Sequence, residues 1–314
     1  MLETLAESTR LVATVSVDRG AYKQFLFSNL SCRVNIGDGV LDVDRISGRS
    51  DGGNIAGRLV LQLPKQKPAD AEVSVRLTGV PFEEFTHLFG TKEHLIVGDL
   101  RLSGTLRGNG RDSQGVPHSL SGRTNLLIEQ GRILQSKVIW KILGILSLPA
   151  LLQGQVDVEK DGLPFDKISA TILVRNGRIE SENIVVNSPV LKITAAGNYD
   201  LPTDQLDFVV AVSPFGSYSQ LLKSIPLFGK LLAGERKGLA TALFQVKGPL
   251  QEPDVTYMPL RSLAAGLSGL AQLALDVLKN TLMLPKEMIE SSDNEAPVPE
   301  TRQAPETTAA PPSP

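Results

Sequence analysis

The sequence predicts a mainly β fold in which short strands follow one another as an antiparallel meander. Runs rich in Ile, Val, Leu and Thr are separated by turn-forming residues about every 10–15 positions. Within the runs apolar and polar residues alternate, which is the period of two typical of half-buried strands. The clearest example runs from Gly162 to Asn198, where Asn176-Gly177 and Ser188-Pro189 separate three strand-like runs.

The first 130 residues are expected to form repeating strands over 11–17, 25–36, 40–48, 55–63, 73–78, 95–108 and 120–129. The triplet Gly37-Asp38-Gly39 predicts a hairpin turn, and Asp51-Gly52-Gly53 predicts the next one. From Val73 to Thr78 apolar and polar residues alternate strictly. One face of this strand should therefore be covered while the other meets water.

Residues 131–258 continue the pattern, with strands expected over 168–176, 179–186, 191–198, 206–212, 239–247 and 254–258. In the strand 191–198, Leu191 and Ile193 fall on one face while Lys192 and Thr194 fall on the other. We therefore expect this strand to be half-buried. The run 206–212 is apolar on both faces, which favours a central or covered strand.

Three shorter stretches have helical patterns. Phe82–Phe89 follows Pro81 and precedes Gly90, the residues favoured at the first helical position and just past a helix end. Residues 135–152 are mainly apolar and are broken by Pro149, so they are too short to span a bilayer. This helix either packs on a sheet or lies at an interface. Residues 214–238 predict two short apolar helices or a helical hairpin.

The segment 259–286 is predicted to form an amphipathic helix. Its apolar residues recur at spacings of three and four and include Leu263, Leu267, Leu270 and Val277. We expect this helix to cap the end of the sheet or to dock on a membrane or a partner. Residues 287–314 are rich in Pro, Glu, Ser, Thr and Ala, and we expect this tail to be disordered.

The composition argues against several functional classes. The net charge is −2, with 32 basic and 34 acidic residues, so a nucleic-acid partner is not expected. Aromatic residues make up only 5% of the chain, which excludes an aromatic stacking platform. Cys32 is the only cysteine, so no disulfide can form within the chain. The sequence begins without the pattern of a signal peptide and contains no apolar run long enough for a spanning helix.

No constellation for catalysis or metal binding is visible. His87, His94 and His118 are scattered without ligand spacing, and surface positions are expected for them. Asp38, Asp42 and Asp44 do not match a calcium loop, because the bidentate Glu at its end is missing. The motifs of phosphate loops, nucleophile elbows and dinucleotide folds are also absent. We therefore predict a protein that is not an enzyme and needs no cofactor or metal.

Several short phrases in residues 160–258 carry a family resemblance. They are Asn176-Gly177-Arg178-Ile179, Asn183-Ile184-Val185-Val186, Gly197-Asn198-Tyr199-Asp200-Leu201, Gly248-Pro249-Leu250 and Glu252-Pro253-Asp254-Val255. With them, this region resembles the C-terminal region of the AsmA-like family, the AsmA/TamB superfamily of Gram-negative envelope proteins. Residues 30–129 are compatible with the repeating strands of that family.

The resemblance implies a long, twisted antiparallel sheet that forms an incompletely closed, taco-like groove with an apolar interior. Such proteins are thought to bridge the inner and outer membranes and to conduct phospholipid. The resemblance thus implies a periplasmic, membrane-associated protein whose partner is phospholipid. A membrane surface and other envelope proteins are further candidate partners. Typical members begin with an inner-membrane helix, and we expect that anchor to lie outside this chain.

One-sided Leu and Val strands need a cover for their apolar face. The cover is either a second protein layer, which gives a closed core, or acyl chains in an open groove. For the groove we predict a lining of Leu59, Leu61, Leu63, Val73, Val75, Leu77, Leu100, Leu102, Leu106, Leu191 and Ile193. An alternative function is a structural or assembly factor for outer-membrane proteins, acting through exposed strand edges.

Overall fold

The computed structural model describes residues 10–62, 69–88, 95–110, 119–134, 136–146, 161–214, 241–258 and 277. The chain divides into two compact units, Met1–Leu282 and Met283–Pro314, and every described residue lies in the first. The division of the chain into the segments 1–130, 131–258, 259–286 and 287–314 remains a prediction. Several predicted positions lie outside the described residues. They are Leu63, Phe89, His94 and His118, the run 214–238 beyond Pro214, and the predicted helix 259–286 apart from Val277.

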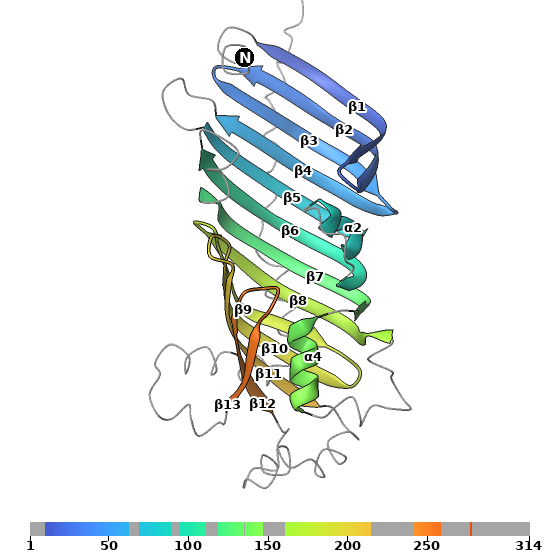
Figure 1. The fold of residues 1–314 in the computed structure, drawn as a ribbon. Coiled ribbons are helices and arrows are strands. Elements are labelled where there is room, and N and C mark those ends of the chain that lie inside the picture. Colours follow the sequence, from blue (N-terminus) through green and yellow to red (C-terminus); the bar gives the residue numbers. More distant parts are fainter. Residues whose placement is uncertain are drawn as a thin grey trace, which may run out of the picture. The chain divides into compact units, whose positions relative to one another are not determined.

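Thirteen strands in the described part form one antiparallel sheet in chain order (Figure 1). Their bounds are β1 Leu11–Tyr22, β2 Phe25–Gly37, β3 Val40–Ser50, β4 Gly53–Gln62, β5 Ala69–Pro81, β6 Ile96–Gly110, β7 Ser121–Ile133, β8 Leu163–Arg175, β9 Arg178–Asn187, β10 Leu191–Asp200, β11 Gln205–Pro214, β12 Ala242–Gly248 and β13 Asp254–Met258. Among these residues β1 and β13 do not pair with each other, so the sheet is open. The predicted antiparallel meander is confirmed.

Local turn chemistry explains why neighbouring strands pair. Asp38-Gly39, Asp51-Gly52 and Asn176-Gly177 all have positive φ at both residues, with values between 42° and 87°. Two-residue turns of this kind match the right-handed twist of the strands they join. They link β2 to β3, β3 to β4, and β8 to β9. The hairpins predicted at these turns are therefore confirmed.

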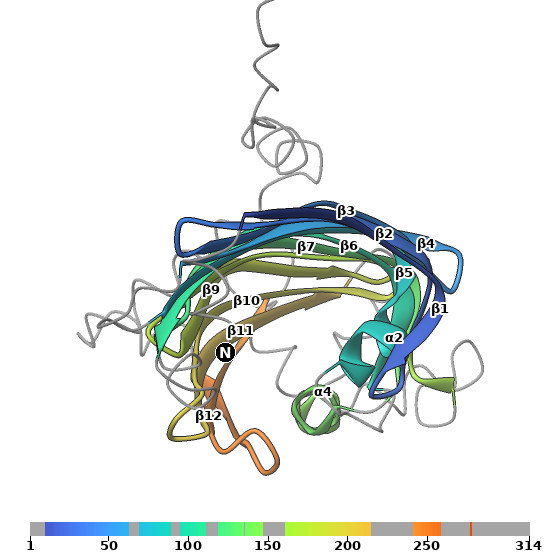
Figure 2. The ribbon, with the colours of Figure 1, turned by 90° about the horizontal axis from the view of Figure 1, so that it is seen from above.

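The sheet is curved, and its two faces differ in chemistry (Figure 2). Residues directly opposite in the ladder share a face, and one such row runs through Val34, Val43, Leu59, Val73 and Leu106. Two helices, α2 (Phe82–His87) and α4 (Lys137–Ile145), lie on this same side and pack against its apolar side chains. We call this side the concave face and the opposite side the convex face.

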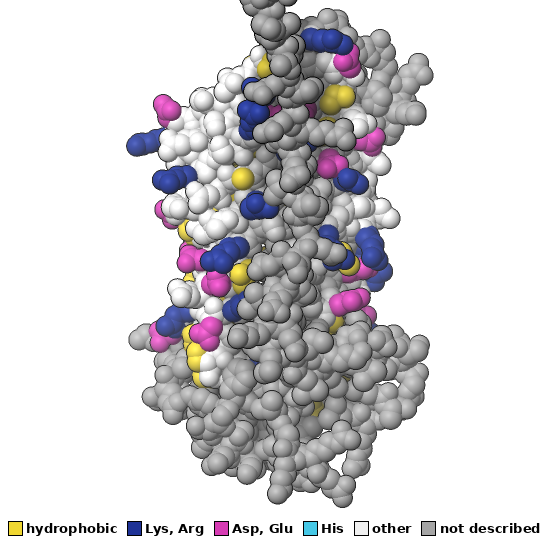
Figure 3. Space-filling view, turned by 180° about the vertical axis from the view of Figure 1, so that it is seen from behind, with side chains coloured by type: hydrophobic (Ala, Val, Ile, Leu, Met, Phe, Trp, Pro, Cys, Tyr) yellow, Lys and Arg dark blue, Asp and Glu magenta, His cyan; other side chains and the backbone are white. Residues whose placement is uncertain are grey.

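The convex face carries the polar residues of the alternating pattern. Ion pairs between strands join Asp42 to Arg58, Glu72 to Arg107, and Glu129 to Arg101. Figure 3 shows charged side chains of both signs over the visible part of this face. The polar side chains of this face therefore lie at the solvent-exposed surface, where several of them form ion pairs with one another.

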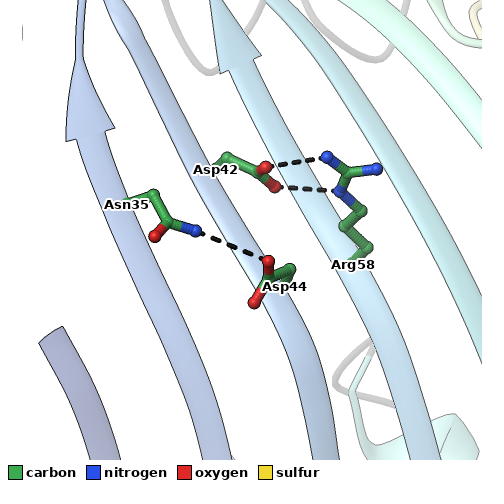
Figure 4. A network of polar contacts seen from close by, with 4 residues as sticks. All are labelled: Asn35, Asp42, Asp44 and Arg58. Atoms are coloured by element: carbon green, nitrogen blue, oxygen red, sulfur yellow. Dashed lines mark hydrogen bonds and ion pairs between the residues drawn. The ribbon is translucent and has the colours of Figure 1, made fainter. Parts of the chain in front are cut away.

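Asp42 and Arg58 form the best-aligned of these pairs (Figure 4). The Arg58 Nε and Nη2 atoms donate to the two Asp42 carboxylate oxygens at 2.9 and 2.7 Å, and this hydrogen bonding raises the pKa of Arg58. Next to it, Asn35 Nδ2 donates to Asp44 Oδ2 at 3.5 Å. These partners explain the acidic residues near the Gly37 turn without calcium.

Because this pair is exposed, we expect Arg58→Ala to lower the free energy of unfolding by about 1 kcal/mol or less. Urea denaturation would measure the change, and the loss should shrink further in high salt because screening already weakens the pair. A loss above about 2 kcal/mol would contradict the view of the convex face as a solvated surface.

Glycines allow neighbouring strands to approach closely where the sheet curves. Gly57 and Gly104 both lie opposite Val75 on the strands flanking β5. A Cβ atom at Gly57 would lie 2.7 Å from the Ser74 carbonyl oxygen, and one at Gly104 would lie 2.5 Å from the Arg123 carbonyl oxygen. A side chain at either position would force the strands apart, so both glycines are needed for this close approach.

Strand β10 differs from its prediction. Lys192 and Thr194, expected to face water, are 7% and 0% exposed. On their side of the sheet Val277 packs with Ala196, Val209 and Leu243, and Thr194 Oγ1 donates to the Val277 carbonyl oxygen at 3.2 Å. The prediction of a half-buried strand is therefore wrong, because a residue more than 80 positions later covers its second face. Burial lowers the pKa of the Lys192 ammonium.

Several predicted bounds also change. Strand β1 continues to Tyr22, five residues beyond the predicted end. Strand β8 begins at Leu163 instead of residue 168, because Leu163 and Phe165 pair with the end of β7. The helix predicted over 135–152 is described as helical only over Lys137–Ile145.

Candidate functional site: an apolar concave face

All predicted groove residues that the structure describes lie on the concave face. Leu59, Val73 and Leu106 are directly opposite one another, and so are Leu77 and Leu102. Leu61 and Val75 share this face by alternation along β4 and β5. Leu100, Leu191 and Ile193 belong to the core cluster on the same side. The structure therefore brings the predicted residues together on one surface.

The exposed fraction of the apolar side chains differs between parts of this surface. Leu11, Val15 and Val73, on β1 and β5, are 41–46% exposed, and Leu59, Leu61 and Leu106 are partly exposed. Leu77, Leu100 and Leu102 are at most 8% exposed, and so are Leu191 and Ile193. The accessible apolar surface thus lies on β1–β6, along the row of residues that runs from Val34 to Leu106.

The deeper part of the concave face forms a core with the two helices. On α2, Phe82 and Phe85 pack against a cluster that includes Phe25 and Leu100. Lys23 Nζ, from the turn between β1 and β2, donates to the Leu88 carbonyl oxygen at the end of α2 at 2.9 Å. These contacts fasten α2 to one edge of the curved sheet.

Helix α4 is amphipathic and packs on the sheet. This is the first of the two alternatives predicted for it, the other being a position at an interface. Ser136 caps it by accepting a hydrogen bond from the Ile139 N–H at 3.3 Å. Ile142 and Leu143 are fully buried in the same cluster as the deep concave residues, while Ile145 is exposed. Of the two possible covers for the apolar face, protein is present at this end of the sheet.

Strict alternation in the sequence does not identify every residue of the concave face, because β-bulges shift which residues point to that face. Along β5, Val73, Val75 and Leu77 are concave, and the pattern would place Gly79 next. Gly79 has a φ of +68° and shifts the register, so Val80 is the next buried concave residue. The same happens on β3, where Val43 and Ile46 both pair on this face across a bulge at Arg45. The Gly before Val80 was the only available signal.

The concave face offers bulk apolar contact and no visible reactive chemistry. In the described part of the chain, no group of three His, Cys, Asp or Glu residues could hold a metal ion. His87 was expected on the surface and is partly buried, with its Nδ1 atom 3.4 Å from the Glu84 carboxylate. The prediction holds only in part, because α2 packs on the sheet through Phe82, Phe85 and Leu88. Cys32 is partly buried.

Comparisons with known proteins place the chain in a family. Within the described ranges, no helix is both long and apolar enough to cross a membrane. Neither the search of curated proteins nor the search of solved structures found a match. The model of the YhdP protein family matches residues 22–255, well over half of the chain and nearly the whole described sheet. This family is part of the AsmA-like group, so the resemblance read from the sequence is confirmed. The chain therefore belongs to the YhdP protein family.

Proposed function

We propose that this chain carries phospholipid between the inner and outer membranes, with acyl chains lying on its concave face. The observation that carries the proposal is a continuous apolar surface on one side of an open sheet, with a charged surface on the other. Membership of an envelope-associated lipid-transport family supports it. Such a protein would work in the periplasm, in contact with a membrane, and without catalysis.

The physical role of the lining residues is collective. Each methylene group that leaves water gains about 0.8 kcal/mol, so an acyl chain needs a long apolar surface more than a specific partner. Thirteen strands at a spacing of about 4.8 Å make a sheet of roughly 58 Å across the strands, of which the accessible part on β1–β6 makes up roughly 24 Å. The full width exceeds the length of one lipid, so a track along the whole sheet would need the covered strands to become accessible as well.

A fluorescent reporter can test whether acyl chains occupy this face. Trp140 is the only tryptophan, so Trp140→Phe gives a silent background. In that background Val73→Trp places an indole on the concave face, and Arg76→Trp places one on the convex face of the same strand. Vesicles of brominated phosphatidylglycerol quench indoles that touch their acyl chains. We expect strong quenching at position 73 and little at position 76.

Native mass spectrometry with lipid extraction gives the independent measurement. Phospholipid bound in several copies is the expected result for a track. Equal quenching at positions 73 and 76 would indicate general surface adsorption. An absence of both quenching and bound lipid would contradict the proposal.

One observation favours the alternative of an assembly factor. In the described part of the chain, β1 pairs only with β2, and its residues Leu11–Val17 carry no charge. Val12 is 69% exposed on this edge strand. Uncharged edges of this kind are templates for pairing with another strand. Saturable, lipid-independent binding to an outer-membrane barrel, lost on Val12→Pro, would favour this function over lipid transport.

A further inference from the structure

The register of the sheet defines two rims of the concave face. The paired residues Ile133 and Leu163, where β7 ends and β8 begins, mark the first rim. At the opposite ends of the strands, the second rim includes Arg175 and Arg178 and, through the pairing of Leu206 with Gly248, the turn between β12 and β13. Figure 2 shows the two rims facing each other across the hollow of the curved sheet.

Helix α4 starts at the first rim and reaches the second. It follows β7 directly, after Leu134. Its Lys137 Nζ donates to the Gln251 carbonyl oxygen at 2.6 Å, and its Lys141 Nζ donates to the Pro253 carbonyl oxygen at 2.6 Å. Both acceptors lie in the turn between β12 and β13. At this end of the sheet, α4 therefore joins the rims on the concave side (Figure 1).

Helix α4 is not itself a member of the strand ladder. Strands β7 and β8 pair directly with each other up to Ile133 and Leu163, and the Leu134 N–H then donates to the Leu95 carbonyl oxygen at 2.9 Å, so the ladder is complete without α4. Gly162, which leads back into β8, has a φ of +77°, a backbone conformation that favours glycine. Movement of α4 would thus leave every strand pair intact.

The contacts that hold α4 are of a kind that lipid could replace. Ile142, Leu143 and Leu146 are buried against the same apolar cluster that contains Leu100 and Ile128 of the concave face. An acyl chain would gain the same contacts from this cluster, so lipid and helix compete for one surface. The two lysine bonds go to neutral carbonyl groups on a turn, where water can compete for both partners.

We propose that α4 is a gate that closes the side of the lipid track at its β12–β13 end, with Lys137 and Lys141 as the latch. When the latch is closed, acyl chains stay on β1–β7. When it opens, the concave face of β8–β12 becomes continuous with the rest of the track, and lipid leaves or enters through the side. The inference rests on the proposed function and adds where, and through which segment, passage is controlled.

A cleavable cross-link across the latch tests the gate. In a Cys32→Ser background, Lys137→Cys and Gln251→Cys are joined with a disulfide-containing bis-maleimide, whose span suits side chains that approach through a lysine. The full chain is then assayed for transfer of fluorescent phosphatidylglycerol between donor and acceptor vesicles. We expect transfer to fall at least tenfold while lipid stays bound, and to recover when the cross-link is reduced. Lys137→Cys alone, treated with the same reagent, is the control.

The double variant Lys137→Ala/Lys141→Ala tests the opposite state without chemistry. We expect several-fold faster transfer, together with a shift of Trp140 emission to longer wavelength, because Trp140 lies on α4 and is partly buried. Lys167→Ala, on the convex side of β8, is the matched control and should change neither readout. Circular dichroism confirms that each variant is folded.

The outcomes separate the two proposals. If the cross-linked protein binds lipid and transfers it at the uncross-linked rate, the gate is wrong and the lipid track stands. If the latch variant transfers lipid as slowly as the wild type with unchanged Trp140 emission, the latch is also wrong. If no variant binds or transfers lipid, the track and the gate both fall.

Discussion

Val73→Asp is expected to reduce phospholipid transfer at least tenfold in a protein that stays folded. Val73 lies between Leu59 and Leu106 in the row of exposed concave residues. It is 41% exposed, so a carboxylate there remains hydrated when no lipid is present. An acyl chain passing over the site would strip that water, at a cost of about 2–7 kcal/mol for a polar group without a partner.

This cost decides the size of the effect, since every 1.4 kcal/mol is a tenfold change in an equilibrium constant. Val73→Ala removes only part of a half-exposed apolar contact, and we expect less than a threefold change for it. Arg76→Asp puts the same carboxylate on the other face of β5 and should leave transfer unchanged. The vesicle transfer assay gives the rate, and thermal unfolding shows whether the three variants remain equally stable.

If Val73→Asp and Arg76→Asp have equal effects, charge on the protein surface would be the cause, and the concave face would not be the lipid path. If Val73→Asp transfers lipid normally, lipid does not pass this row at all. Either result would leave the apolar surface on β1–β6 without a ligand. The exposed edge of β1 would then be favoured as the functional surface.

The sequence was a good guide to strands and faces because both depend on neighbouring residues. Asp-Gly and Asn-Gly fix a two-residue turn locally, and alternation then assigns each side chain to a face until the next bulge. Val80 is a residue that this reasoning does not identify. A register shift at Gly79, which has a positive φ, puts Val80 on the concave face, whereas counting every second residue from Val73 gives Gly79.

Burial was not predictable in the same way, because it depends on segments distant in sequence. The second face of β10 is covered by Val277, so the polar appearance of Lys192 and Thr194 was misleading. The deep concave face is covered by α2 and α4, whose positions do not follow from the strand pattern. Alternation identifies an apolar face, but only the remaining chain decides whether that face is a core or a groove.

Leu102 is the residue for which this distinction has the largest consequence. The alternation of the sequence places it among the predicted groove residues without distinguishing it from the others. In the structure Leu102 is 8% exposed and belongs to the core cluster with Leu77 and Ile128. We now expect Leu102→Ala to lower the free energy of unfolding by about 2–5 kcal/mol, because it leaves a cavity.

Leu59→Ala is the matched control, since the same substitution falls on the same concave face but at a half-exposed position. We expect it to lose less than about 1.5 kcal/mol, because fewer buried contacts disappear. Leu102→Asp should unfold more readily still, since its carboxylate would be buried without a partner. Its failure to transfer lipid would then report stability and not the lipid path. Urea denaturation of the three variants separates these cases. Equal, small losses for Leu102→Ala and Leu59→Ala would mean that the face at β6 is as open as at β4, and that the lipid track extends deeper than the burial indicates.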